Sequence, residues 1–146
     1  MGDRIGNLRA AADELPVVAR SSVYETAPQG DVRNQPDFLN AAVEIETDLR
    51  PEELLDLCKE VERKLGRQPG QVRHGPRVVD VDLLLLGDLE YESDRLSLPH
   101  REVLTRRFVL EPLLELDPDI ALPDGTSLAA AARALEGQRV ERVGVI

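Results

Sequence analysis

The chain has 146 residues, of which 42% are hydrophobic and 32% are charged, a composition typical of a globular protein, and we expect a single domain over residues 1–146. The formal net charge of −10 disfavours binding to nucleic acid or to an anionic membrane. No apolar run approaches the roughly 18 residues of a membrane span, and no signal-peptide core opens the chain. Because Cys58 is the only cysteine, no internal disulfide can form, and we expect a cytoplasmic protein.

The first part of the chain predicts a helix followed by two strands. Apolar side chains recur at helical spacing over residues 4–15, and Pro16 ends this helix. Residues 17–24 are rich in β-forming residues and predict a strand. The loop over residues 27–37 follows from its prolines, glycine and asparagine. Residues 38–47 predict a second strand, because apolar and charged side chains alternate in its second half.

Residues 51–66 predict a helix with well-marked ends. Pro51 takes a first-turn position, two glutamates follow where the helix dipole favours acidic side chains, and Gly66 closes the helix. A loop of glycine, proline and arginine residues covers 67–77. Residues 78–86 then predict a third strand, an apolar run that two carboxylates interrupt.

The last third predicts a short extended excursion over 89–98, helices over 104–116 and 128–135, and a tail at 140–145 that could add an edge strand. The order of elements matches a β-α-β-β-α-β pattern without its first strand. The predicted fold class is therefore α+β: a ferredoxin-like antiparallel sheet flanked by helices, with the first strand missing. That strand is central in the topology, so two unpaired edges would result.

Two carboxylates are the most informative feature of the predicted strand. Asp80 and Asp82 lie two residues apart, so they project from the same face of a strand. Burying them is costly unless they are neutralised, and a divalent metal held against a phosphate would neutralise them. Arg73 and Arg77 precede them and could bind that phosphate. The residues predict a magnesium–nucleotide site, and a solvated strand face is an equal alternative from spacing alone.

Three motifs carry a resemblance to a known family. The first is R-x-G-P-R-x-x-D-V-D-L-L at residues 73–84, and the second is S-S-V-Y-E-T-A-P with Q-P-D-F-L-N-A within residues 21–41. The third is L-P-H at residues 98–100, followed by Arg106 and Phe108. In these motifs the chain resembles the 6-hydroxymethyl-7,8-dihydropterin pyrophosphokinases over nearly its whole length.

This resemblance implies transfer of the diphosphate of ATP to the hydroxymethyl group of 6-hydroxymethyl-7,8-dihydropterin, in folate biosynthesis. The products would be AMP and the pterin diphosphate. The implied partners are small-molecule substrates, with ATP as cosubstrate and Mg²⁺, two ions in similar members, as the cofactor. We expect a monomer that binds neither nucleic acid nor membrane.

The resemblance also implies roles for individual residues. The magnesium ligands would be Asp80 and Asp82, which could also guide the proton of the substrate hydroxyl. The implied catalytic residues are Arg67, Arg77, Asp80 and Asp82. The implied ATP contacts are Glu62, Arg73, Arg77, Arg95, Ser97, His100 and Arg106. The implied pterin contacts are Thr26, Ala27, Gln29, Phe38, Asn40 and Phe108.

Structural alternatives compete with several of these roles. Glu62 equally fits a solvent-facing helix residue, and Arg67 a loop residue that only improves solubility. Phe38 and Phe108 could be core residues, although planar rings would suit stacking on a pterin. Asn40 could be a strand-edge residue, although its amide offers the donor and acceptor that a pterin edge requires.

The start of the chain departs from the family pattern. Similar proteins begin with a strand ending in a Gly-Ser-Asn-like segment, whereas this chain starts at Met1-Gly2-Asp3-Arg4. We expect that the true start lies upstream, the other reading being that the strand is truly missing. Two further departures are His74 and Arg101, where some members have aromatic residues. Two other functions stay open, a non-catalytic ferredoxin-like nucleotide-binding module and another magnesium-dependent phosphoryl transferase.

Overall fold

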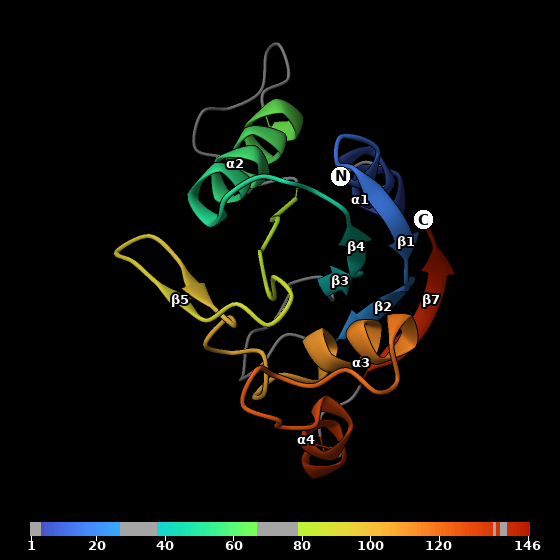
Figure 1. The fold of residues 1–146 in the computed structure, drawn as a ribbon. Coiled ribbons are helices and arrows are strands. Elements are labelled where there is room, and N and C mark those ends of the chain that lie inside the picture. The colour runs from blue at the N-terminus through green and yellow to red at the C-terminus, as the bar shows by residue number, and fades with distance from the viewer. Residues whose placement is uncertain (1–3, 27–37, 67–78, 136, 138–139) are drawn as a thin grey trace.

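A computed structural model describes residues 4–26, 38–66, 79–135, 137 and 140–146. These residues form an α+β structure with antiparallel strand pairing (Figure 1). Its helices are α1 (Arg4–Asp13), α2 (Pro51–Gly66), α3 (Arg107–Leu116) and α4 (Leu128–Ala134). Its strands are β1 (Val17–Arg20), β2 (Ser22–Thr26), β3 (Phe38–Asn40), β4 (Val43–Ile45), β5 (Tyr91–Glu92), β6 (Ser97–Leu98) and β7 (Glu141–Val145).

The two predicted N-terminal strands are present, but each is divided in two. β1 pairs with β4 and β2 pairs with β3, and the division falls at Ser21 on one side and Ala42 on the other. The Ser21 backbone N–H donates to the Ala42 carbonyl (2.9 Å), while the Ser21 hydroxyl accepts from the Ala42 N–H (2.8 Å). Because a side-chain hydroxyl takes the place of a backbone partner, the ladder is interrupted and two small sheets result.

The C-terminal tail forms an edge strand, as predicted. β7 pairs with β2, which gives the order β3-β2-β7. Helix α3 packs against β2, and its Glu115 joins the two elements. This carboxylate accepts hydrogen bonds from the Ser22 backbone N–H (3.0 Å), the Ser22 hydroxyl (2.9 Å) and the Tyr24 hydroxyl (2.6 Å). Burial raises the pKa of Glu115, but these hydrogen bonds outweigh it and the pKa is lowered overall.

Helix α2 has the predicted bounds of residues 51–66. At its start, Glu53 accepts a hydrogen bond from the Arg50 backbone N–H (2.9 Å), which caps the first turn. Its buried stripe packs into the core at helical spacing and consists of Leu54, Leu55, Cys58 and Val61. The boundaries are local in origin, because capping and periodicity act within the helix itself.

The third predicted strand, over residues 78–86, is wrong for the described part of that range. Residues 79–86 have no regular secondary structure and pair with no strand among the described residues. Alternation of side chains is nevertheless kept: Val79 and Val81 pack towards α1 and α2, whereas Asp80 and Asp82 are exposed. The carboxylates are therefore not buried, and the predicted cost of burying them does not arise.

A groove lies between β4 and residues 79–87, and we call it the central groove. Its volume is about 400 Å³, and α1, α2 and α3 contribute to its walls. Both Asp80 and Asp82 line it, as do the other residues from 79 to 87. Other lining residues are Ala12, Val43, Ile45, Cys58 and Leu113. The described strands form three separate small sheets and no single four-stranded sheet, and of these strands β4 lines the groove.

The last third follows the prediction closely. The excursion over residues 89–98 is a hairpin in which β5 and β6 pair (Tyr91 with Leu98), and Figure 1 shows it projecting beyond the end of α2. Helix α3 starts at Arg107, later than the predicted residue 104, because turns with hydrogen bonds between residues three apart cover 100–105. Helix α4 starts after Ser127, whose hydroxyl accepts from the Ala130 N–H.

Candidate functional site

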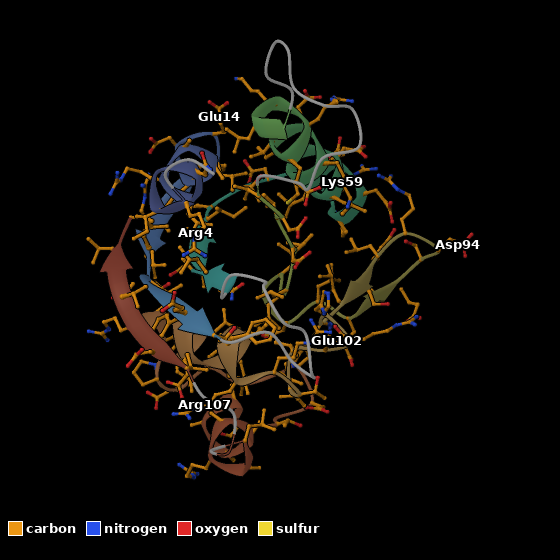
Figure 2. The ribbon with its side chains drawn as sticks, turned by 180° about the vertical axis from the view of Figure 1, so that it is seen from behind. Arg4, Glu14, Lys59, Asp94, Glu102 and Arg107 are labelled. Atoms are coloured by element: carbon orange, nitrogen blue, oxygen red, sulfur yellow. The ribbon has the colours of Figure 1, made fainter. Side chains whose placement is uncertain are left out.

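A second pocket brings several predicted nucleotide-contact residues together, and we call it the hairpin pocket. Its volume is about 430 Å³, within the size range of small-molecule sites. It lies between α2, the β5–β6 hairpin, residues 81–83 and residues 100–102. Figure 2 shows three of its lining residues from three directions: Lys59 on α2, Asp94 at the tip of the hairpin, and Glu102 beyond the end of β6.

Asp82 links this pocket to the central groove, because it lines both. Two contacts fix the backbone around it. The Val81 N–H donates to a Glu62 carboxylate oxygen (2.6 Å), and the His100 N–H donates to the Leu84 carbonyl (2.8 Å). The segment that carries the two aspartates is therefore held on one side by α2 and on the other by the chain after β6.

The contact with the Val81 N–H bears on the alternative that Glu62 is a solvent-facing helix residue. Its side chain is only 9% exposed, so the solvent-facing reading is wrong. The second carboxylate oxygen lies 3.6 Å from the Lys59 ammonium. Glu62 thus connects α2 to the backbone between Asp80 and Asp82, which gives it a part in holding the aspartate segment.

The two aspartates fit a magnesium ion by the chemistry of their donor atoms. Mg²⁺ prefers hard oxygen ligands and is typically held by one or two carboxylates together with substrate phosphates and water. Asp80 and Asp82 are exposed and line the same groove, so their carboxylates are accessible. Within the described ranges, no cluster of three or more His, Cys, Asp or Glu side chains could hold a metal.

The cations of the hairpin pocket already have carboxylate partners. Arg95 binds Glu52 (3.2 Å) and Asp56 (2.6 Å), both on α2. The Asp56 hydrogen bond is the main reason that the pKa of Arg95 is raised. Arg101 binds Glu92 at 2.6 Å. These side chains are placed at the pocket, but each would have to share its charge with a phosphate.

His100 and Ser97 lie on the wall of the hairpin pocket. The Glu102 backbone N–H donates to the Nδ1 atom of His100 (3.1 Å). Because Nδ1 acts as an acceptor, the neutral ring carries its proton on Nε2, which can then donate to a ligand oxygen. The Ser97 hydroxyl accepts from the Nε atom of Arg101 (3.1 Å) and keeps its own proton for another acceptor.

The predicted pterin contacts lie elsewhere, along β2, β3 and the start of α3. Thr26 is buried at the end of β2, opposite Phe38 in the ladder. The Nδ2 atom of Asn40 is buried and has no hydrogen-bond partner among the described residues. Helix α3, which carries the half-buried Phe108, packs against both strands. The Arg106 guanidinium lies 5.6 Å from the centre of the Phe108 ring, a cation–π distance.

Arg106 also binds Glu102 at 2.7 Å. It therefore connects the pterin-side residue Phe108 with the turn that follows His100. Several predicted site residues lie outside the described part of the chain, and the structure does not place them: Arg67, Arg73, Arg77, Ala27, Gln29 and the side chain of Phe38. The phosphate-binding loop of the prediction is thus largely outside the described residues.

Sequence reasoning missed the role of Glu52 near this site. Its carboxylate binds Tyr91, Ser93 and Arg95 on the hairpin. In the sequence it was only one of two glutamates after Pro51, which a favourable helix dipole explains fully. No local signal could have distinguished it from Glu53, because its partners lie about forty positions further along the chain.

None of the described helices has the length and apolar character that a membrane crossing requires.

Comparison with known proteins gives consistent results. The family model described as "7,8-dihydro-6-hydroxymethylpterin-pyrophosphokinase (HPPK)" matches residues 1–118. A 2-amino-4-hydroxy-6-hydroxymethyldihydropteridine pyrophosphokinase of Methylorubrum extorquens is 42% identical over 149 residues, with 98% of this chain and 92% of the relative covered. The protein of the same name from Bacillus subtilis is 44% identical over 122 residues, which cover 80% of this chain and 72% of the relative. A mitochondrial folate synthesis bifunctional protein of Arabidopsis thaliana is 44% identical over 80% of this chain and 22% of its own length.

Proposed function

The chain belongs to the 7,8-dihydro-6-hydroxymethylpterin-pyrophosphokinase family, and from this we propose the reaction that it catalyses. It transfers the diphosphate of ATP to the hydroxymethyl group of 6-hydroxymethyl-7,8-dihydropterin, a step of folate biosynthesis. The observation that carries this proposal is the match over most of the chain to relatives named pyrophosphokinases. The position of Asp82 at the junction of the two cavities supports it from the structure.

The hydroxyl oxygen of the pterin attacks the β-phosphorus of ATP, and the bond between that phosphorus and the oxygen of the α-phosphate breaks, so that AMP leaves. Such transfers depend mainly on positioning and charge neutralisation. The Nε2–H group of His100 and the hydroxyl of Ser97 donate hydrogen bonds to phosphate oxygens in the hairpin pocket. Arg95 and Arg106 add positive charge beside them, together with Arg67, Arg73 and Arg77 of the preceding loop.

Asp80 and Asp82 hold magnesium in this proposal. When bound, the metal neutralises charge on the phosphates that it contacts. One of the two carboxylates, that of Asp80 or that of Asp82, guides the single proton that the pterin hydroxyl releases, so that no separate base is needed. Glu62 contributes by holding the Val81 backbone between them (2.6 Å).

The pterin binds between β2, β3 and the start of α3. The buried Asn40 Nδ2 atom supports this assignment, because a buried donor without a partner is costly and a pterin acceptor would satisfy it. Phe38 and Phe108 stack on the ring, and Thr26, Ala27 and Gln29 line the same site. These roles distinguish the proposal from a phosphoryl transferase without a heterocyclic acceptor, which would have no use for stacking rings and a side-chain amide at these positions.

The test is an assay for AMP release with ATP, Mg²⁺ and the hydroxymethyl-dihydropterin. We expect AMP and pterin diphosphate in equal amounts, and loss of turnover in Asp82→Ala and Asp80→Ala with the fold intact by circular dichroism. Asp88→Ala is the matched control, since Asp88 is an exposed aspartate in the turn after this segment and should keep activity. ADP as the coproduct, or activity retained in Asp82→Ala, would contradict the proposal.

For the fold, we propose a ferredoxin-like sheet in which one central strand position is open in this chain. The central groove supports this, because β4 and residues 79–87 line it, and among the described residues β4 pairs with β1 alone. A β-strand placed in this groove would complete the sheet. An experimental structure of the protein tests this, and a sheet with no open position between β4 and residues 79–86 would reject it.

The remaining assignments belong to the same proposal. The chain acts as one domain over residues 1–146 and as a monomer. Its partners are two small molecules, ATP and a reduced pterin, with no nucleic acid and no membrane. Its site of action is the cytoplasm.

A further inference from the structure

One carboxylate outside both cavities holds the hairpin that forms a wall of the hairpin pocket. Glu52 lies in the first turn of α2 and lines neither cavity. One of its oxygens accepts from the Tyr91 hydroxyl (2.7 Å) and the Ser93 hydroxyl (2.6 Å). The other accepts from the Arg95 guanidinium (3.2 Å). A single side chain thus binds three residues of the hairpin.

The contact with Ser93 organises the tip of the hairpin. While the Ser93 hydroxyl donates to Glu52, its oxygen accepts from the backbone N–H groups of Arg95 and Leu96 (both 3.2 Å). The Ser93 N–H in turn donates to the Leu96 carbonyl (2.8 Å). The position of Glu52 therefore fixes the turn that joins β5 to β6. The hydrogen bonds from Ser93 and then from Tyr91 lower the pKa of Glu52, so its carboxylate is ionised at neutral pH.

Apolar packing lies beneath these polar contacts. Leu55 of α2 is buried against Leu96 and Leu98 of the hairpin. Such packing is not directional and tolerates sliding of one element on another, whereas the hydrogen bonds of Glu52 fix a single register. Ser97 follows this turn directly and His100 comes three residues later, and both lie on the wall of the hairpin pocket.

We infer that Glu52 is a positioning residue for nucleotide binding, which holds the β5–β6 hairpin on α2 and so keeps Ser97 and His100 at the pocket wall. This inference rests on the proposed function, because it takes ATP as the ligand of that pocket. Glu52 itself touches no substrate in this assignment. Its effect is on the fraction of molecules in which the wall is in place.

The experiment compares three variants. Glu52→Ala removes all three hairpin contacts. Tyr91→Phe removes one of them, keeps the ring, and alters a residue that does not line the pocket. Glu53→Ala is the matched control: Glu53 is the next residue of the same turn and accepts from the Arg50 N–H (2.9 Å) of its own helix start. Each variant is measured for binding of a non-hydrolysable ATP analogue with Mg²⁺, for KM and kcat, and for thermal unfolding.

If the hairpin holds Ser97 and His100 at the pocket wall in only a tenth of the molecules, the apparent affinity for ATP is lowered by about tenfold. We expect Glu52→Ala to raise the Kd of the analogue and the KM for ATP by about this factor, with kcat and the KM for the pterin within about twofold of wild type. Tyr91→Phe should raise the KM for ATP by about two- to fivefold. Glu53→Ala should lower the unfolding temperature and leave the KM for ATP unchanged.

If Glu52 were merely structural, Glu52→Ala would lower the unfolding temperature and leave ATP affinity at the wild-type value, as in Glu53→Ala. That result would overturn the inference and leave the proposed function standing. Should Glu52→Ala fail to fold, Tyr91→Phe decides, and an unchanged KM for ATP in that variant overturns the inference. Failure of the proposed function is seen separately, as absence of AMP release by the wild-type protein.

Discussion

At the scale of single residues, the carboxylate contact that holds the backbone between Asp80 and Asp82 says as much about the candidate site as these two aspartates do. Glu62 does not lie at either cavity wall, yet its carboxylate accepts from the N–H of Val81, the residue between Asp80 and Asp82. A carboxylate that accepts a hydrogen bond from a partly buried backbone N–H stabilises the folded structure. When the carboxylate is removed, this N–H is left without an acceptor, and the folded structure is destabilised. The same residue thus contributes both to folding and to the placement of the site.

This predicts a specific pattern for variants of Glu62. Glu62→Ala should lower the free energy of unfolding by about 2 kcal/mol, because the Val81 N–H loses a charged acceptor, and should reduce kcat as the aspartate segment loosens. Glu62→Gln keeps an oxygen at this position and should keep most of the stability. Urea unfolding and the AMP assay measure the two effects.

Glu60→Ala provides the control for this prediction. Glu60 is exposed on the same helix and pairs with Arg63 within it, so its removal should change stability by less than about 0.5 kcal/mol. Equal stability and activity of Glu62→Ala and Glu60→Ala would show that the Val81 contact is unimportant.

At the scale of elements, the packing of α3 against β2 includes hydrogen bonds to one ionised side chain, Glu115. Glu115 accepts from Ser22 and Tyr24 on β2, and its pKa is lowered in the folded protein despite the opposing effect of burial. A lowered folded pKa means that the contribution to stability is complete above the unfolded pKa of about 4.3 and is lost as pH falls through the folded value.

Stability should therefore fall as pH is lowered from about 4.3, and part of this fall should be absent in Glu115→Gln. At neutral pH, Tyr24→Phe should cost about 1–2 kcal/mol, because it removes the 2.6 Å hydrogen bond to Glu115 while the ring is kept. Urea unfolding across pH 3–7 measures both. The same acid slope in wild type and Glu115→Gln would exclude Glu115 as its cause.

Elements were predictable to the extent that their determinants are local. The bounds of α2 follow from Pro51, the acidic first turn and Gly66, and the structure has the same bounds. The division of the first two strands depends on the Ser21 hydroxyl reaching Ala42, twenty-one positions away, and no nearby residue announces it. Residues 79–86 have the composition of a strand, but a strand also needs a paired neighbour, which composition does not supply.

The site divides in the same way. The residue type and spacing of Asp80 and Asp82 indicated a metal site, whereas Ser97 and His100 were assigned from the family resemblance alone. Asp80 and Asp82 line the central groove, and Asp82, Ser97 and His100 line the hairpin pocket. The contacts of Glu52 and the Val81 contact of Glu62 join segments far apart in sequence, and only the folded structure brings these groups together. Sequence therefore indicated the groups at the cavities better than the groups that hold them.

At the scale of the whole molecule, the described strands form three small sheets instead of one continuous sheet, and one of these sheets borders the central groove through β4. Apolar side chains of α1, β4 and α3 line this groove together with residues 79–87. A strand placed there would give hydrogen-bond partners to β4 and to residues 79–86 at once. Residues 79–86 line the groove and pair with no strand among the described residues.

Cys58 gives this groove a chemical reporter. It is the only thiol of the chain and lines the groove, yet only 4% of it is exposed. Burial, and then the nearby charges of Glu62 and Asp82, raise its pKa to about 11, so little thiolate exists at neutral pH and alkylation should be slow. Any molecule that fills the groove should slow alkylation further, and the rate at which this one sulfur atom is labelled would then report whether the groove is occupied.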